Sequence, residues 1–559
     1  MPHLIVVPVL LPMLTAALML LMGERRRSWK AALNLLGCVF GLAAALALLL
    51  QVDGAGPPAA LGVYLPGNWA APFGIVLVAD RLSVLMLVLT ACVGLASAMF
   101  SIARWHAAGV HFHPLFQIQL MGLNGAFLTG DLFNLFVFFE VMLVASYGLL
   151  LHGSGRARVR AGLHYIAVNL LASSLFLIGV AVLYGVTGTL NMADMAAKLA
   201  MIPADDRGLL HAGAAILGLA FLAKAALWPL NFWLVPAYTA ASTPVAALFA
   251  LMTKVGIYAV LRVWTLFFAP GGAAEEGLFG AQALLWSGLA TLAFGALGVL
   301  SSQHLGKLAG YSLIVSSGTL LATVGFGQPA VTAAALYYLV SSTLAVSALF
   351  LLVELIERSR QVQDDMPLTE AADERAPFVL DATETARLPE GVNLDDTEQA
   401  LIGRAIPAAM AFIGLAFMLC ALLVAGLPPL SGFVAKFAIL SAVLNPEGFG
   451  RLGQPTTAGW GLMALLIGSG LAAAIALSRI GIRYFWAPQE RPSPRLRVIE
   501  CLPVAGLLLA CMGLLVGGAP VLRYTQAAAE SLHRPAPYIR AVLSAKPVPG
   551  PAAGAQVRP

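Results

Sequence analysis

The stretch AFLAKAALWPL, residues 220–230, places Lys224 in an otherwise apolar segment and follows it with Pro229. An ammonium group inside a bilayer costs about 2.5–3.5 kcal/mol on insertion scales, so a membrane helix keeps one only where it is paired, hydrated or used. A proline removes a backbone hydrogen bond and breaks or kinks its helix. The stretch therefore predicts a broken membrane helix that carries a functional lysine.

The whole chain has the composition of a membrane protein. Of its 559 residues, 60% are hydrophobic and only 11% are charged, and its mean hydropathy is +0.87. Soluble domains have about a quarter charged residues. Apolar runs of about 20 residues, each long enough to cross a bilayer, recur from Leu4 to Val516. This pattern predicts an all-α polytopic membrane protein without a separate soluble domain.

The composition also argues against a cleaved signal, a nucleic-acid partner and a metal centre. The first apolar run, Leu4 to Met22, lacks a preceding basic region and a following cleavage site, so it is expected to remain as the first helix. The net charge of +5 lies in loops, where it reports orientation. The cysteines lie singly in apolar runs, and His106, His111 and His113 have no Cys or carboxylate neighbours. We therefore expect no metal site and no cofactor.

The apolar runs between polar breaks predict about fourteen membrane helices. They span residues 3–23, 30–51, 79–101, 112–130, 131–152, 161–187, 207–236, 241–266, 279–301, 307–327, 330–356, 404–445, 457–483 and 498–517. The seventh and twelfth are long and interrupted by proline, so each is predicted to hold two half-helices. Paired interruptions of this kind point to inverted repeats that meet at a site near the midplane. Helices four to eight and nine to thirteen would form two inverted five-helix repeats.

This organisation divides the chain into four parts. Residues 1–111 hold helices one to three, and 112–266 hold the first repeat. Residues 267–483 hold the second repeat with an acidic loop at 357–404, and 484–559 hold helix fourteen and a disordered tail. The loop is too polar to pack a core, so a flexible solvated loop is favoured over a docking or cation-attracting role. Prolines in the tail argue against a lateral helix after the last span.

Loop charges predict the orientation. Basic clusters follow helices one and five and surround the connection between helices thirteen and fourteen. All three clusters fall on one face, which the positive-inside rule makes cytoplasmic. The predicted acidic loop lies on the same face, and both termini face outward.

Glu140 is the acidic partner that the sequence offers to Lys224. It ends the run GDLFNLFVFFE, residues 130–140, and lies about 13.5 Å along the helix from Asp131, near half the hydrocarbon thickness. Burial favours the neutral forms of both groups, whereas pairing favours the charged forms. A Glu140–Lys224 pair that opens and closes would therefore switch the proton affinity of the lysine. A static ion pair that locks the broken helix is the alternative.

Two further lysines extend this row. Lys254 lies in LMTKVGIY, in the middle of helix eight, and Lys436 lies in the second half of segment twelve. Desolvated lysines can pass protons, and neither residue is close enough to a membrane surface to make snorkelling the better account. We predict a proton relay through both.

The proline breaks predict water next to the lysines. Pro229 follows Lys224, and Pro428 and Pro429 precede Lys436. Interrupted helices expose backbone groups that need water or partners at membrane depth. The three prolines therefore predict hydrated pockets.

Four residues are possible accessory groups. Asp131 opens an apolar helix, so a helix cap is favoured over proton entry. His164 lies one turn inside helix six and is either a relay group or a packed interfacial residue. His304 and Lys307 lie at the start of helix ten and are either interfacial residues or a proton entrance. Glu354, near the end of helix eleven, is expected to be interfacial.

These residues also carry a family resemblance. KAALWPLNFWL at 224–234, STPVAALFALMTKVGIYAVLR at 242–262, FFEVML at 138–143 and GLPPLSGFVAKF at 426–437 resemble the core motifs of the antiporter-like subunits. That superfamily joins respiratory complex I with the Mrp-type multisubunit monovalent cation/proton antiporters. The run SSLFLIGVAVLYGVTGTLNMAD, residues 173–194, is most similar to the D-type subunits of the Mrp antiporters.

The resemblance implies a secondary transporter subunit rather than an enzyme. Glu140 and Lys224 would form the controlling ion pair, and Lys254 and Lys436 would pass protons along a central hydrophilic axis. The subunit would work among other membrane subunits in a bacterial inner membrane and lipid bilayer. Protons would enter in exchange for Na+ or K+. The alternatives are a proton-pumping subunit of a complex I or membrane-hydrogenase type of respiratory enzyme, and a subunit that only scaffolds its neighbours.

One helix departs from the family pattern. Helix eleven of many relatives carries a His and a Lys, but YLVSSTLAVSALF, residues 338–350, has neither. A relay step there would have to use water, Ser341, Ser342 or a tyrosine.

Overall fold

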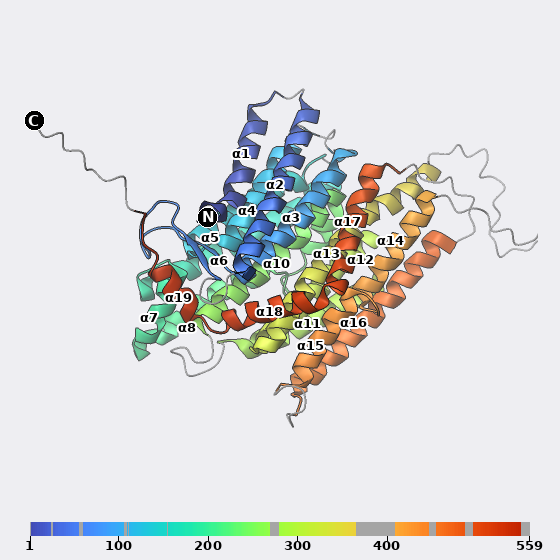
Figure 1. Ribbon diagram of the computed structural model, residues 1–559. Coiled ribbons are helices and arrows are strands. Elements are labelled where there is room, and N and C mark those ends of the chain that lie inside the picture. Colours follow the sequence, from blue (N-terminus) through green and yellow to red (C-terminus); the bar gives the residue numbers. More distant parts are fainter. Residues whose placement is uncertain are drawn as a thin grey trace, which may run out of the picture.

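Long helices run side by side through most of the molecule (Figure 1). The computed structural model describes residues 2–23, 26–54, 60–105, 109, 111–153, 155–268, 279–364, 408–446, 454–486 and 496–548. The helices are α1 (Val7–Leu21), α2 (Arg27–Gly54), α3 (Arg81–Ile102), α4 (Phe112–Leu128), α5 (Leu132–Leu150), α6 (Arg156–Thr187), α7 (Met192–Lys198), α8 (Arg207–Lys224), α9 (Leu234–Ala240), α10 (Thr243–Phe267), α11 (Ala281–Ser301), α12 (Leu305–Gly325), α13 (Pro329–Asp364), α14 (Ala408–Ala425), α15 (Ser431–Leu444), α16 (Thr457–Gly481), α17 (Val498–Val516), α18 (Gly518–Leu532) and α19 (Ala536–Leu543).

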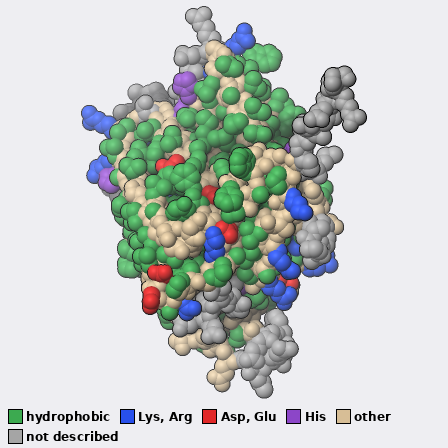
Figure 2. Space-filling view, turned by 90° about the vertical axis from the view of Figure 1, so that its left-hand side faces the viewer, with side chains coloured by type: hydrophobic (Ala, Val, Ile, Leu, Met, Phe, Trp, Pro, Cys, Tyr) green, Lys and Arg blue, Asp and Glu red, His purple; other side chains and the backbone are tan. Residues whose placement is uncertain are grey.

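The helical membrane fold is confirmed. Within the described residues, twelve helices are long and apolar enough to cross a membrane. Hydrophobic side chains cover most of the face in Figure 2, and charged ones are sparse on it. Such a surface suits contact with lipid rather than water. The count of fourteen spans, the two inverted repeats and the four-part division remain predictions. The acidic loop predicted at 357–404 lies largely outside the described residues.

A small sheet was not predicted. Strands β1 (Gly62–Tyr64) and β2 (Leu77–Ala79) pair antiparallel, with Val63 opposite Val78. The sheet lies between α2 and α3, so its short strands fall in a segment that hydropathy alone assigns to a loop.

α10 is the central helix of the bundle. It packs against α3, α8, α12 and α13, and all 25 of its residues except the first are buried. A helix buried on every side inside a membrane protein brings any charged side chain it carries into the protein interior rather than to lipid. Lys254 and Arg262 both lie on it.

The seventh and twelfth segments are broken as predicted. α8 ends at Lys224 and α9 begins only at Leu234. α14 ends at Ala425 and α15 begins at Ser431. Pro229, and Pro428 with Pro429, lie inside these two gaps.

Both breaks share one hydrogen-bond pattern. The amide of Leu227 donates to the carbonyl of Leu222 over 3.0 Å, and that of Leu427 donates to the carbonyl of Leu422 over 3.0 Å. The residue before each of these leucines has the left-handed backbone conformation. This is a common way for a helix to end, in which an amide donates to the carbonyl five residues earlier instead of four. The second break repeats the first at a spacing of 200 residues.

The C-terminal segment corrects a prediction. The tail after Arg534 was expected to be disordered, but Ala536–Leu543 forms α19, which packs against α7. The prolines do not prevent this, since Pro537 lies in the first helical turn, where its missing N–H is not needed. Tyr538 and Val542, one turn apart, are buried. A lateral helix also exists: α18 crosses the bundle beside α13 and α3 (Figure 1).

Candidate functional site

Glu140 and Lys224 are joined through a serine. α6 packs against both α5 and α8 and inserts Ser173 between the two charged groups. The Ser173 hydroxyl donates a short hydrogen bond to Glu140 Oε1, and Lys224 Nζ donates to Ser173 Oγ over 3.4 Å. The direct ion pair expected from the sequence is therefore replaced, within the described residues, by a bridged one. The hydroxyl can accept from the amine while it donates to the carboxylate.

The Lys224 amine also faces an aromatic ring. It lies 5.4 Å from the centroid of Phe139, and Lys224 is 5% exposed. Phe139 in turn contacts Phe176 and Phe221 edge to face. An aromatic face stabilises an ammonium group, more so where water is excluded. The lysine is thus held by a hydroxyl and a ring.

The first break lies against the central helix. A Cβ added at Gly256 of α10 would come within 2.7 Å of the Ala225 nitrogen and 2.8 Å of the Phe221 oxygen. Only a glycine allows the two backbones to approach so closely. Lys254, two residues earlier, is therefore fixed on a helix that touches the end of α8.

Lys254 begins a chain of hydroxyl groups. It is 0% exposed, and its Nζ donates to Ser316 Oγ of α12 over 2.7 Å. Ser316 Oγ in turn lies 3.0 Å from Ser342 Oγ of α13. Ser342 is one of the serines that the sequence offered as a replacement for the missing His and Lys of helix eleven.

Lys436 reaches back across the second break. Its Nζ donates to the carbonyl of Ala425 over 2.8 Å and lies 3.5 Å from that of Val424. These carbonyls end α14 and have no partner within the helix, and the helix dipole there favours a cation. The two breaks therefore place their lysines differently. Lys224 is the last residue of the helix before its break, whereas Lys436 lies on the helix after its break and reaches back to the end of α14.

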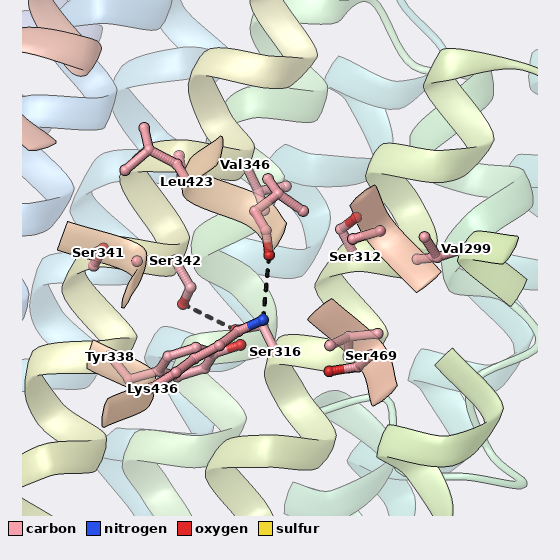
Figure 3. Close-up of a pocket in the computed structure, with 15 residues that line it drawn as sticks. Val299, Ser312, Ser316, Tyr338, Ser341, Ser342, Val346, Leu423, Lys436 and Ser469 are labelled. Carbon is pink, nitrogen blue, oxygen red and sulfur yellow. Dashed lines mark hydrogen bonds between the residues drawn. The ribbon is translucent and has the colours of Figure 1, made fainter. Parts of the chain in front are cut away.

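A cavity joins the two hydroxyl-bearing regions. It measures about 30 Å³, which is room for one or two water molecules. Lys436 extends into it between Ser316 and Ser342 on one side and Ser469 on the other (Figure 3). Its other polar lining residues are Ser312, Tyr338 and Ser341. The cavity therefore brings the hydroxyl chain from Lys254 next to the amine of Lys436.

Two of the accessory residues share a larger, open pocket. His164 and Lys307 line a pocket of about 930 Å³ together with Arg160 and Asn231. Asn231 lies in the first break and is 2% exposed, and its Nδ2 has no hydrogen-bond partner among the described residues. The pocket thus extends from exposed basic groups to the broken helix beside Lys224. His304 precedes α12 and does not line this pocket.

Asp131 is a helix cap. Its Oδ1 accepts from the backbone N–H of Asn134 over 2.8 Å at the start of α5. Burial raises the pKa of Asp131, and the backbone hydrogen bonds oppose that rise. The capping interpretation therefore agrees with its geometry.

Glu354 has more partners than the sequence indicated. Its side chain is 11% exposed and pairs with Arg358 over 3.0 Å. It also accepts from Trp105 over 2.8 Å and from Thr243. Arg358 continues to Glu500 over 2.7 Å. Glu354 thus connects four segments, and nothing in its local sequence indicates these distant partners.

No metal centre emerges from the geometry. Across the described ranges, no group of three or more His, Cys, Asp or Glu side chains is placed to hold a metal ion.

Comparisons with known proteins identify the family. Residues 129–380 match the model of the NADH:quinone oxidoreductase/Mrp antiporter transmembrane family. A Rhizobium meliloti protein, named as the D subunit of a probable K(+)/H(+) antiporter, is 53% identical over 99% of both chains. A Bacillus subtilis protein, named as the D subunit of a Na(+)/H(+) antiporter, is 34% identical over 97% of this chain and all of the relative.

Solved structures share the fold. A chain of the Mrp complex from Dietzia sp. DQ12-45-1b superposes with a TM-score of 0.78 at 27% identity, covering 97% of this chain and 100% of that one. A chain of respiratory complex I from Thermus thermophilus gives a TM-score of 0.72 at 23% identity, covering 97% of this chain and 100% of that one. At 23% identity, the likeness to the complex I chain shows a shared fold and nothing about function.

Proposed function

Since the chain belongs to the family of D subunits of multisubunit cation/proton antiporters, we propose that it carries the proton half of the exchange. The proton would move through Glu140, Lys224, Lys254 and Lys436, in a bacterial inner membrane. The observation that carries this proposal is the meeting of the Lys254–Ser316–Ser342 chain with Lys436 in one cavity.

The hydroxyl chain supplies a physical route for the proton. A serine or a water molecule can donate one proton while it accepts another, so a row of them passes a proton without moving itself. Lys254 gives a proton to Ser316, and Ser342 with one or two cavity waters delivers a proton to Lys436. This route replaces the ionisable side chains that helix eleven lacks.

The bridge at Glu140 supplies the control. While Ser173 donates to the carboxylate and accepts from Lys224, the charges on both groups stabilise each other. Rotation of the serine hydroxyl or displacement of α6 weakens that stabilisation, and Lys224 then releases its proton more readily. Exchange with water would take place through the open pocket at His164, Lys307 and Asn231.

The partner ion is a monovalent cation. The relative from Rhizobium meliloti is named for K+ and that from Bacillus subtilis for Na+, and either ion fits the proposal. The likeness to a chain of an Mrp complex supports work beside other membrane subunits. The alternative of a respiratory proton pump rests on the family model, whose description names both classes of protein, and on fold likeness.

The proposal is tested in everted membrane vesicles that contain the complete complex. Glu140→Ala should abolish cation-dependent proton flux while all subunits still assemble, because the bridge to Lys224 loses its anion. Val144→Ala, one turn along α5 and 62% exposed before substitution, is the matched control and should keep wild-type flux. Flux that survives Glu140→Ala in assembled complexes would favour a scaffold role.

A further inference from the structure

A second set of buried polar side chains lies away from the lysine row, between α2 and α4. Asn34 and Gln117 are 1% and 0% exposed, and Gln117 Nε2 donates to Asn34 Oδ1 over 2.8 Å. His113 lies 3.0 Å from the Asn34 amide, and Cys38 lies 3.5 Å from Gln117 Nε2. Buried polar groups at membrane depth are costly and usually mark functional positions.

Two of these residues, Gln117 and Cys38, border a small cavity. It measures about 20 Å³ and lies among α1, α2, α3 and α4, which is enough for one small ion or one water molecule. Small residues create the space: Gly37, Gly41 and Ala45 of α2 line it. A Cβ added at Gly41 would meet no atom within 4 Å, so a larger side chain has room there.

Three oxygen atoms at this cavity have no hydrogen-bond partner among the described residues. They are Thr90 Oγ1, Gln117 Oε1 and Asn124 Oδ1, and all three residues line the cavity. A buried oxygen without a partner loses the free energy of its hydration. Three such oxygens around one small space favour binding of a polar or charged group there.

The orientation of Gln117 is fixed by its own bonds. Its Nε2 donates to both the backbone oxygen and Oδ1 of Asn34, over 3.1 and 2.8 Å. Both partners are acceptors, so a flipped amide would place oxygen against oxygen. The Gln117 Oε1 therefore points away from these two oxygens of Asn34.

The orientation of Asn124 is fixed in the same way. Its Nδ2 donates to the carbonyl of Pro8 over 2.8 Å. In a regular helix that carbonyl would accept from residue 12, but Pro12 has no N–H. The Asn124 amide thus satisfies an acceptor orphaned by proline, and its Oδ1 remains without a donor.

Thr90 differs from other threonines in the bundle. Thr15, Thr187 and Thr265 each donate to the carbonyl four residues earlier, the usual arrangement within a helix. Thr90 makes no such bond and is 1% exposed. Its hydroxyl oxygen adds a third neutral ligand to the two amide oxygens.

We propose that this cavity binds a monovalent cation, Na+ or K+, through Thr90 Oγ1, Gln117 Oε1 and Asn124 Oδ1. A cation can take all three oxygens as ligands at once and needs no hydrogen-bond donor from the site. Neutral oxygens are ligands that alkali cations accept in place of their hydration shell. None of the described lining residues is a carboxylate, so binding is weak enough for the ion to leave. The identity of this ion as the exchanged one rests on the proposed antiport, but its binding does not.

The test uses the purified complete complex, with radioactive Na+ and Rb+ as probes for equilibrium binding and vesicle flux as the second readout. Gly41→Leu fills the cavity, and Thr90→Val removes one ligand without changing its volume. Each should lower cation binding and raise the apparent KM for the cation about ten-fold, as expected for the loss of one buried polar contact. Gly506→Leu is the matched control, because a Cβ there also meets no atom within 4 Å and no residue of α17 lines the cavity.

The outcomes separate this proposal from the proton route. Glu140→Ala should lose flux but retain wild-type cation binding. Unchanged binding and KM in assembled Gly41→Leu and Thr90→Val complexes would overturn the cation site and leave water as its occupant. Retained flux in Glu140→Ala would instead contradict the proton route and leave the binding result to stand by itself.

Discussion

Replacement of Gly426 by alanine should disable Lys436 without unfolding the second break. Gly426 has φ 75, and a Cβ there would lie 2.6 Å from Lys436 Cδ, 2.9 Å from its Cε and 3.1 Å from its Nζ. The lysine side chain is flexible and can move aside, but the amine then leaves the carbonyl of Ala425, 2.8 Å away.

The magnitude follows from two terms. A left-handed alanine costs about 1–2 kcal/mol, and the first break already carries Ala226 in this conformation, at φ 58. Loss of the hydrogen bond between the Lys436 amine and the Ala425 carbonyl removes about 1.5–3 kcal/mol of the free energy that holds the amine in place. The fraction of molecules in which the Lys436 amine keeps its position then falls by about ten-fold or more. Proton flux should fall by a similar factor.

Gly188→Ala is the matched control, since Gly188 has φ 65 and a Cβ there meets no atom within 4 Å. The assay compares cation-dependent proton flux in vesicles with the melting temperature of the solubilised complex. Both variants should lose similar stability, and only Gly426→Ala should lose flux. Equal flux in the two variants would refute the role assigned to the Lys436 amine.

Three further outcomes are expected. Ser316→Ala should lower flux about ten-fold because Lys254 loses its hydroxyl acceptor, and Ser316→Thr, which keeps a hydroxyl, should recover part of it in the same vesicle assay. Ser173→Ala should shift the pH profile of flux while preserving assembly; an unmoved profile would count against the bridge. Asp80→Ala should destabilise the complex by about 3–5 kcal/mol because the buried Arg262, 2.6 Å away, loses its anion. Burial raises the pKa of Asp80, but Arg262 and the Ser83 hydrogen bonds outweigh burial and hold that pKa below its ordinary 3.8; this stabilisation should be complete above pH 3.8 and disappear in melting curves as the pH falls below the lowered value.

The helix pattern was predictable because hydropathy is a property of each residue in turn. The segment predicted at 241–266 forms α10 at Thr243–Phe267, and the one at 457–483 contains α16 at Thr457–Gly481. The proline breaks were predictable for the same reason, since a missing N–H acts on its own helix. The tail was not predictable, because burial of Tyr538 against distant helices offsets its prolines.

The charged members of the site were visible in the sequence, but the hydroxyls that connect them were not. Glu140 and Lys224 stand out because ionisable groups are rare at membrane depth. Ser173 and Ser316 do not, since serine is common in membrane helices and only helix rotation decides which serine faces a lysine. The polar face of α2 was likewise passed over, although Asn34 and Cys38 lie one helical turn apart.

The sequence by itself determined that this chain is a helical membrane protein, where two of its helices break and that Lys224, Lys254 and Lys436 lie inside it. Only the tertiary structure decided that Ser173 separates Glu140 from Lys224 and that Lys436 reaches across its break to the end of α14. The reason is that solvation and backbone constraints act on residues one at a time, whereas a hydrogen bond between helices requires both partners to be rotated toward each other. That rotation is set by the packing of the whole bundle.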